Sequence, residues 1–305
     1  MSLCWPPGRG ERRTCDRKRQ SPHGYSAFYA RWFVNRLRAG FCEVVNPFNA
    51  AQVSRISLAA GDVDAIVFWT RDPRPLLPHL SEIRALGHEP FFLVTLMDNS
   101  LALDPKCPRP ETAVATFVAL AEVLPGRITW RYDPLVLTGA TPPDWHRRTF
   151  ETLCARLAGL TDRVTVSFLE PYRKIAKRLA VAATSGCHLL PEDTDERIRL
   201  LTDLRDMAAS RGMVLRTCSQ PEIFETAGIA PGRCIDPDWI AGHIGRPLPV
   251  AKDPHQRPRC GCAASRDIGA YDTCLFGCAY CYATTSFDRA RRAFAGHDPD
   301  APSLG

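Results

Sequence analysis

The sequence predicts an α/β fold built from βα units around a parallel sheet. The main observation is that strand-like and helical patterns alternate through the middle of the chain, as they do in βα units. The length of 305 residues also lies within the size range of a single α/β barrel. Periodicity alone does not distinguish a barrel from an open, doubly wound sheet, so both forms remain open at this point.

The predicted elements follow one another in a regular order. Aromatic residues at helical spacing predict a helix that starts at Tyr25 and ends at Gly40, and residues 41–45 form a short strand. Five later segments are mostly apolar and rich in β-branched or aromatic residues, as strands are: 64–69, 90–96, 127–132, 163–168 and 212–217. Helical patterns lie between them, at about 75–86, 111–124, 144–158 and 192–210.

Composition divides the chain into four parts. Residues 1–24 are rich in Arg, Pro and Gly and are predicted to be a disordered basic segment. Residues 25–217 form the barrel-like domain. Alternation is lost after residue 217, and residues 218–287 are predicted to be an irregular, cysteine-rich region. Residues 288–305 are charged and rich in Gly and Pro, which predicts a flexible tail.

Charge and hydropathy narrow the classes of protein. Much of the net charge of +6 comes from residues 9–19, and the rest of the chain is close to balance, so nucleic acid is not expected as a partner. No apolar run is long enough to span a bilayer, and the first residues lack the apolar segment of a signal peptide. We therefore expect a cytoplasmic protein without a membrane partner, in which cysteines are metal ligands, reactive groups or buried residues.

Cysteines concentrate near the C-terminus. Cys274, Cys278 and Cys281 have the spacing C-x3-C-x2-C, with the aromatic residue Tyr280 just before the last cysteine. Three thiolates are one fewer than a closed zinc site or a ferredoxin-type cluster needs, so an iron–sulfur cluster bound here would keep one iron open. Gly277 would permit the coiled loop that such a cluster requires.

Two other interpretations of these cysteines remain open. The spacing i, i+4, i+7 also describes one face of a helix, and Cys260, Cys262, Cys278 and Cys281 could form a zinc site. A second metal site is also predicted from Cys218, Cys234, Cys260 and Cys262, which are enough for a second cluster or a zinc ion. By contrast, Cys42, Cys107, Cys154 and Cys187 show no metal spacing.

Polar residues occur where the predicted strands end. Because the C-terminal ends of parallel strands face the ligand site in α/β folds, these side chains are candidates for one cavity: Thr70, Arg71, Thr95, Asp98, Arg131, Asp133, Ser167, Glu170, Cys218 and Ser219. Strand alternation would direct Arg131 and Asp133 to the same side, where they either bind a ligand or form an internal ion pair. Glu170, with Tyr172 and Lys174, is either a set that positions a ligand or a solvated loop.

Several stretches together resemble known families. They are Asn46-Pro-Phe, Val67-Phe-Trp-Thr-Arg-Asp-Pro73, Trp130-Arg-Tyr-Asp-Pro134, Cys234-Ile-Asp, Gln256-Arg and Cys260-Gly-Cys through Tyr282-Ala. The cysteine loop resembles the cluster loop of radical S-adenosylmethionine (SAM) enzymes. The chain as a whole, over about residues 25–285, resembles the DUF1848 family of bacterial proteins, whose cysteine cluster is similar to that loop but lies at the C-terminal end.

The resemblance implies a partial or complete (β/α) barrel of radical SAM type with a cysteine-rich C-terminal extension, and a set of cofactors. Cys274, Cys278 and Cys281 would bind a [4Fe–4S] cluster whose open iron chelates SAM, and electron transfer would cleave SAM to a radical that takes hydrogen from an unknown substrate. A ferredoxin or flavodoxin would supply the electron. Tyr280, Thr70, Arg71 and Ser167 are the expected cofactor contacts, and Arg131, Asp133 and Glu170 are the expected catalytic residues. The Gly-Gly-Glu motif typical of these enzymes is absent, and Thr70-Arg71-Asp72 occupies the comparable place.

Two alternative functions accompany this hypothesis. In the first, zinc or a cluster staples the C-terminal region onto the α/β domain of a protein that catalyses no reaction. In the second, the barrel is a DNA-repair lyase of the photoproduct-lyase kind, although no basic groove rich in aromatic residues is visible in the sequence.

Overall fold

The computed structural model describes residues 2–4, 25–47, 49–219, 221–253 and 256–304. The chain divides into two compact units. Unit 1 comprises Met1–Leu93, Arg233–Leu275 and Ala283–Gly305, and unit 2 comprises Val94–Gly232 and Phe276–Tyr282. The segment Phe276–Tyr282 therefore belongs to a different unit from the residues on either side of it.

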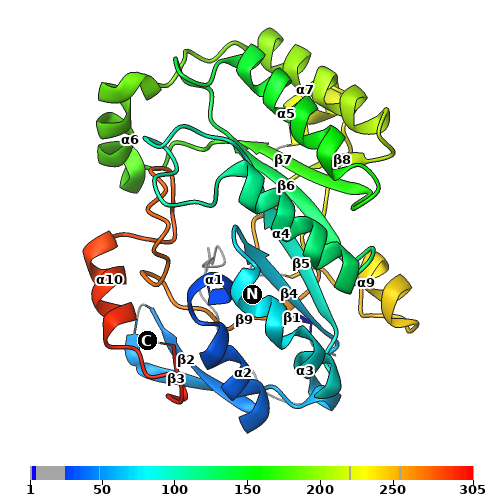
Figure 1. Ribbon diagram of the computed structural model, residues 1–305, viewed down its shortest axis with the longest axis vertical. Helices are drawn as coiled ribbons and strands as arrows, with labels where there is room; N and C mark the ends of the chain where they lie inside the picture. The colour runs from blue at the N-terminus through cyan, green and yellow to red at the C-terminus, as the bar shows by residue number, and fades with distance from the viewer. Residues whose placement is uncertain (1, 5–24, 48, 220, 254–255, 305) are drawn as a thin grey trace. The chain divides into compact units, whose positions relative to one another are not determined.

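The predicted α/β fold with a parallel sheet is confirmed. The sheet has the strand order β8-β7-β6-β5-β4-β1-β9 (Figure 1). Its five parallel strands match the five predicted ones: β4 (Ala65–Thr70), β5 (Pro90–Thr95), β6 (Ile128–Leu135), β7 (Arg163–Phe168) and β8 (Val214–Thr217). Strand β4 is buried at every position, which is typical of a parallel strand covered on both faces.

The first strand of this sheet was not expected. Strand β1 (Ser2–Cys4) pairs antiparallel with β4 and with β9 (Ser265–Asp267), whereas the sequence predicts disorder there. The remainder of the predicted disordered segment, residue 1 and residues 5–24, lies outside the described residues.

The predicted helices are present. The pattern at 111–124 forms α4 (Pro110–Val123), that at 144–158 forms α5 (Pro143–Leu157), and that at 192–210 forms α7 (Thr194–Ala209). The pattern at 75–86 divides into the 3₁₀ segment η2 (Arg74–His79) and α3 (Leu80–Ala85). Pro78 lies inside η2, and because proline has no N–H to donate it prevents a continuous α-helix.

The N-terminal part of unit 1 contains a hairpin that the sequence predicts only in part. Helices α1 (Tyr25–Phe28) and α2 (Ala30–Ala39) are followed by Gly40, whose φ of 74° ends α2. Strand β2 (Phe41–Asn46) then pairs antiparallel with β3 (Asn49–Ser57). Strand β3 is exposed over most of its length, so it lacks the apolar pattern by which a strand is recognised.

Short elements complete the chain. They are the 3₁₀ segments η1 (Ala60–Asp62) and η3 (Arg173–Ile175), helix α6 (Ala176–Ala182), the π segment η4 (Ala183–Cys187), and helices α8 (Pro221–Thr226), α9 (Pro237–Ile244) and α10 (Phe287–Ala295). Helices α8 and α9 lie in the region predicted to be irregular. None of the helices in the described part of the chain combines the length and apolar character that crossing a bilayer requires.

The structure differs from the prediction of a flexible tail at residues 288–305. Residues 287–295 form α10, and the Phe294 ring meets the Tyr29 ring edge to face at 5.5 Å. After the helix, the carbonyl of Ala301 accepts a 2.9 Å hydrogen bond from the Trp32 indole, so the C-terminal residues pack beside α1 and α2 (Figure 1). Charged residues are frequent in this tail, but its aromatic residue Phe294 packs against Tyr29 near the beginning of the described chain.

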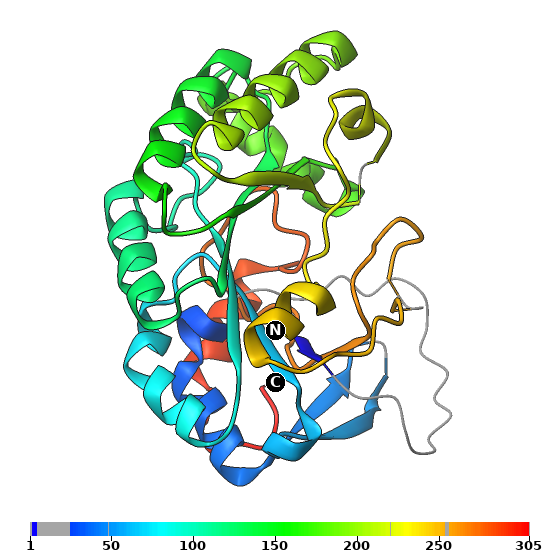
Figure 2. The ribbon, with the colours of Figure 1, turned by 90° about the vertical axis from the view of Figure 1, so that its right-hand side faces the viewer.

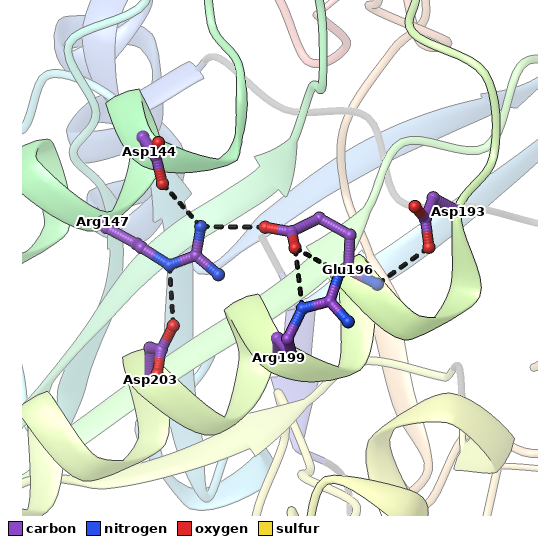
Figure 3. A network of polar contacts seen from close by, with 6 residues as sticks. All are labelled: Asp144, Arg147, Asp193, Glu196, Arg199 and Asp203. Carbon is purple, nitrogen blue, oxygen red and sulfur yellow. Dashed lines mark hydrogen bonds and ion pairs between the residues drawn. The ribbon is translucent and has the colours of Figure 1, made fainter.

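Helices α5 and α7 of unit 2 are joined by a polar network (Figure 3). The Arg147 guanidinium contacts Asp144 and Glu196 at 2.8 Å and Asp203 at 2.6 Å. Asp193 caps α7 by accepting from the backbone N–H of Glu196 at 2.9 Å, as N-cap residues do. The network positions α7 on α5, next to the strands that carry the candidate site.

Candidate functional site

The cysteine loop is a coil and not a helix. Its backbone is anchored in unit 2, where the N–H of Ala279 donates to the carbonyl of Leu103 at 2.8 Å. Gly277 has a φ of 76°, and a Cβ there would lie 3.3 Å from the Cγ of Pro105, so glycine suits both the turn and the close approach. No helix forms across the described residues 271–286, and the helical-stripe interpretation of the three cysteines is therefore wrong.

Tyr280 is held by a buried polar network. Its hydroxyl donates to the Oδ2 atom of Asp104 at 2.7 Å, and the Asn99 amide nitrogen donates to the same oxygen at 2.9 Å. The Oδ1 atom of Asn99 is buried and has no hydrogen-bond partner among the described residues. The network fixes the loop at Tyr280, while the predicted role of Tyr280 as a cofactor contact stays a prediction.

A fourth cysteine lies against the loop. The Sγ atom of Cys107 is 3.5 Å from the Sγ atom of Cys278, and a carboxylate oxygen of Asp104 lies within 4.8 Å of both sulfurs. The three ligand atoms could hold one metal ion. Sequence analysis missed Cys107 because it has no metal spacing. The only available signal is topological, since Cys107 follows β5 and the segments after parallel strands gather at one edge of a sheet.

Cys274 lies in unit 1, where it is buried near Tyr29. Burial, and then the Cys274 thiol, raise the pKa of Tyr29 to about 12. The Tyr29 hydroxyl is buried and has no hydrogen-bond partner among the described residues. A polar group is therefore buried next to the first cysteine of the loop, and no described residue provides an acceptor for it.

Asp272 closes the base of the loop. Its N–H donates to the carbonyl of Ala283 at 3.1 Å, and its carboxylate accepts hydrogen bonds from both the backbone and the hydroxyl of Thr285. Arg289 of α10 adds an ion pair at 3.0 Å. Although burial raises the pKa of Asp272, the hydrogen bonds from Thr285 and Ser286 lower it overall, so the carboxylate is ionised as it holds the two ends of the loop together.

The other end of the loop lies near the C-terminal ends of the strands in unit 2. The carbonyl of Cys281 accepts a 2.5 Å hydrogen bond from Arg178 of α6. Burial raises the pKa of Tyr282 well above its ordinary value, Arg131 opposes this rise, and Cys281, Cys218 and Asp133 add to it. Tyr282 is thus within electrostatic reach of residues at the ends of β6 and β8.

Arg131 and Asp133 form an ion pair, as one of the two interpretations of the sequence expected. Both side chains are about nine-tenths buried, and the other oxygen of Asp133 accepts a hydrogen bond from Ser167 of β7. Burying two charges is costly unless their hydrogen bonds are satisfied, and Ser167 contributes to that. Their roles toward a ligand stay predictions.

Glu170 belongs to a second group around Tyr282. Its carboxylate accepts a 2.5 Å hydrogen bond from the Tyr172 hydroxyl. The Tyr172 ring meets the Tyr282 ring at 6.3 Å, and the Lys174 ammonium lies 5.4 Å from the centre of the Tyr282 ring. The three residues predicted as a set are therefore linked to the end of the cysteine loop.

Thr70 and Arg71 belong to unit 1. The Thr70 hydroxyl accepts from the backbone N–H of Asp72 at 3.0 Å, and Asp72 pairs with Arg74 at 2.6 Å. These contacts are turn chemistry of the kind that follows many strands, and the expected contact of Thr70 and Arg71 with a cofactor stays a prediction.

The cysteines of the predicted second metal site lie in both units. Cys234, Cys260 and Cys262 are together in unit 1, where two backbone N–H groups donate to the sulfur of Cys262. Cys218 belongs to unit 2 and follows β8.

No curated protein matches the chain. The model of a family described as a domain of unknown function, DUF1848, matches residues 25–283, which include β2 to β9 and the whole cysteine loop. The chain is an α/β protein with cysteines that could bind metal, and it belongs to the DUF1848 family.

Proposed function

We propose that this protein is a cytoplasmic iron–sulfur enzyme of radical SAM type, in which Cys274, Cys278 and Cys281 bind a [4Fe–4S] cluster. One observation carries the proposal: the loop segment Phe276–Tyr282 belongs to the same compact unit as β6, β7 and β8. In α/β enzymes catalytic groups gather at such strand ends.

The residues present suit the group. Thiolates are the usual ligands of iron–sulfur clusters, and hydrogen bonds to their sulfur atoms help to set the reduction potential of the cluster. The buried Tyr29 hydroxyl, without an acceptor among the described residues, would have one in a ligated sulfur of Cys274. When bound and reduced, the cluster would supply the electron that cleaves SAM into methionine and a radical able to take hydrogen from a substrate.

Residues of unit 2 would then bind SAM and the substrate. Arg131 is suited to pair with a carboxylate of SAM or of the substrate, because a guanidinium binds carboxylates in a bidentate manner. Asp133 is suited to a ribose hydroxyl or an ammonium group, and Ser167 would keep its carboxylate oriented. Glu170, through Tyr172, would hold the Tyr282 ring in place. The fold would be a partial or complete barrel, with a ferredoxin or flavodoxin as electron donor.

The test is SAM cleavage by anaerobically purified protein. We expect brown protein whose visible absorption bleaches on reduction and which releases 5′-deoxyadenosine from SAM after reduction. The variant Cys278→Ala should lose the iron bound by the loop and the activity together. The buried Cys154→Ala variant in α5 is the matched control and should keep both. Protein that holds iron and sulfide yet releases no deoxyadenosine with any low-potential reductant would disprove the proposal.

A second candidate function is that of a protein without catalytic activity, in which one metal ion cross-links the cysteine loop to the segment after β5. The distance between two cysteines favours this candidate. Two thiolates on a tetrahedral zinc ion lie about 3.8 Å apart when each Zn–S bond is about 2.3 Å, which is close to the 3.5 Å between Cys107 and Cys278. Asp104 would be the third ligand. Colourless protein containing one zinc that is lost in Cys107→Ala would support this candidate.

A further inference from the structure

The sulfur atoms of Cys107 and Cys278 are almost close enough for a covalent bond. They lie 3.5 Å apart, and both residues belong to unit 2. The loop that carries Cys278 is in the orange-red part of the ribbon in Figure 2. A disulfide bond has an S–S length of about 2.05 Å, so the two sulfurs would have to approach by only about 1.5 Å.

The backbone of the loop is fixed against the segment 103–107. The N–H of Ala279 donates to the carbonyl of Leu103 at 2.8 Å. On the other side of the central cysteine, Gly277 comes so close to Pro105 that a Cβ on it would lie 3.3 Å from the proline Cγ. Residues on both sides of the central cysteine are therefore positioned by contacts that do not involve sulfur.

Buried side chains hold the same two segments together. The Tyr280 hydroxyl and the Asn99 amide both donate to the Oδ2 atom of Asp104, at 2.7 and 2.9 Å, and all three side chains are buried. The fold thus brings the two thiols together without a metal ion. Holding two reacting groups in place favours their reaction with each other over reaction with groups in solution.

The two cysteines differ in exposure. Cys278 is buried, whereas Cys107 is partly exposed. Because exchange with a disulfide in solution depends on access to the attacking sulfur, Cys107 is suited to react first and Cys278 to react second, from inside the protein.

We propose that Cys107 and Cys278 form a reversible disulfide in the metal-free protein, and that this disulfide controls whether the loop binds its cluster. Thiolates are the ligands of metals, so oxidation would withdraw the central cysteine of the C-x3-C-x2-C motif and reduction would restore it. Disulfides in reducing compartments are usually transient and of this kind. The control of cluster binding rests on the proposed function, whereas the disulfide itself does not.

The oxidant would be a low-molecular-weight disulfide. The Cys107 thiolate attacks one of its sulfurs, which forms a mixed disulfide and releases one small thiol. The Cys278 thiolate then attacks the Cys107 sulfur and releases the second small thiol. Two electrons pass from the two cysteines to the oxidant, and the two cysteine protons end on the two released thiols.

The first experiment looks for this bond in the unsubstituted, full-length chain. The protein is freed of metal with a chelator, reduced, incubated anaerobically with glutathione disulfide, alkylated and digested with trypsin. Mass spectrometry should find the peptide that begins at Cys107 linked to the peptide that contains Cys274, Cys278 and Cys281. Fragmentation should assign the bond to Cys278 at least tenfold more often than to the other two cysteines, and dithiothreitol should reverse it.

The second experiment measures the consequence for the cluster. Before reconstitution with iron and sulfide, one sample is oxidised with glutathione disulfide and one is kept reduced. The oxidised unsubstituted chain should take up at least fivefold less iron than the reduced one. In Cys107→Ala the same oxidation should lower the uptake less than twofold, because Cys278 then has lost its partner. The buried Cys154→Ala of α5 is the matched control and should respond as the unsubstituted chain does.

Each result bears on one claim. A Cys107 peptide that stays unlinked to Cys278 would overturn the proposal, and so would a linked chain that takes up as much iron as the reduced chain. A reduced chain that takes up no iron would overturn the proposed function and with it the control of cluster binding, while the linked peptide would still establish the disulfide. Absence of SAM cleavage by the iron-loaded protein would count against the proposed function alone, because neither experiment uses SAM.

Discussion

The Sγ atoms of Cys107 and Cys278 lie 3.5 Å apart although 171 positions separate them in the chain. Cys278 is the central cysteine of the loop, and Cys107 follows β5. This pair separates the two candidate functions, because a catalytic cluster on the three loop cysteines does not need Cys107, whereas a single ion bound with Asp104 does.

The first prediction concerns this pair. We expect Cys107→Ala to keep the iron, the sulfide and the SAM cleavage of the unsubstituted protein, and Cys278→Ala to lose the SAM cleavage and the iron and sulfide of the loop cluster. The reason is that Cys278 belongs to the C-x3-C-x2-C motif that is proposed to bind the cluster, whereas Cys107 lies outside this motif. Elemental analysis and deoxyadenosine release check the result, and an equal loss of metal in both variants would favour the single-ion candidate.

The second prediction concerns the buried ion pair of Arg131 and Asp133. Asp133→Ala removes the carboxylate that pairs with the buried Arg131 guanidinium, and breaking a buried ion pair in this way costs about 3–5 kcal/mol of unfolding free energy. The double variant Arg131→Met, Asp133→Val should recover most of that loss, because apolar side chains tolerate burial. Urea unfolding checks the stability.

Activity then separates a structural role from a functional one in the same variants. The double variant should remain inactive in SAM cleavage although it is stable. If it is both stable and active, the pair is structural and neither residue binds SAM or substrate.

The third prediction concerns the network of Figure 3 and its dependence on pH. Burial raises the pKa of Glu196, but hydrogen bonds from Arg147 and Arg199 lower it overall from the ordinary value of 4.5. A carboxylate with a lowered pKa in the folded state stabilises the protein above its ordinary pKa, and this contribution is lost as the pH falls through the lowered value.

Glu196→Gln removes that contribution. At neutral pH we expect it to be about 0.5–1 kcal/mol less stable than the unsubstituted protein, since a partly exposed network is worth little more. The difference should shrink toward zero as the pH falls below about 4. Urea unfolding across this pH range checks the result, with Glu122→Gln on the exposed face of α4 as the control; a difference that is constant with pH would contradict the assignment.

The fourth prediction concerns the C-terminal helix. Arg289, Arg291 and Arg292 are trypsin sites within α10, and a flexible tail would be cut there at once. We expect slow cleavage, because α10 packs on Tyr29 and is capped by Ser286, which accepts from the N–H of Arg289 at 3.2 Å.

Removing the cap provides the comparison. Ser286→Ala should cost about 1 kcal/mol of helix stability and accelerate cleavage at these sites about fivefold, as measured by mass spectrometry of a digestion series. Rapid cleavage of the unsubstituted protein, with no difference from the variant, would show that the tail is not held in place.

Local patterns in the sequence were sufficient for much of the fold. The five parallel strands were recognisable because most of their residues are apolar, β-branched or aromatic, as is typical of strands that pack in the interior of a fold. Strand β3 was not predicted, because its side chains are mostly exposed. Strand β1 was not predicted either, because a strand of three residues shows no pattern of its own and forms by pairing with β4. Helices α8 and α9 were not predicted, because helices of six and eight residues contain too few turns for apolar periodicity to be recognised.

The sequence by itself determined the order of the βα units and the position of the cysteine loop, because apolar periodicity and cysteine spacing are properties of neighbouring residues. Only the tertiary structure decided that Cys107 meets Cys278, that α10 packs beside Tyr29, and that Cys234 lies against Cys262. These pairs join residues far apart in the chain, and their contacts depend on where the sheet and its connections bring each segment, which no local pattern records.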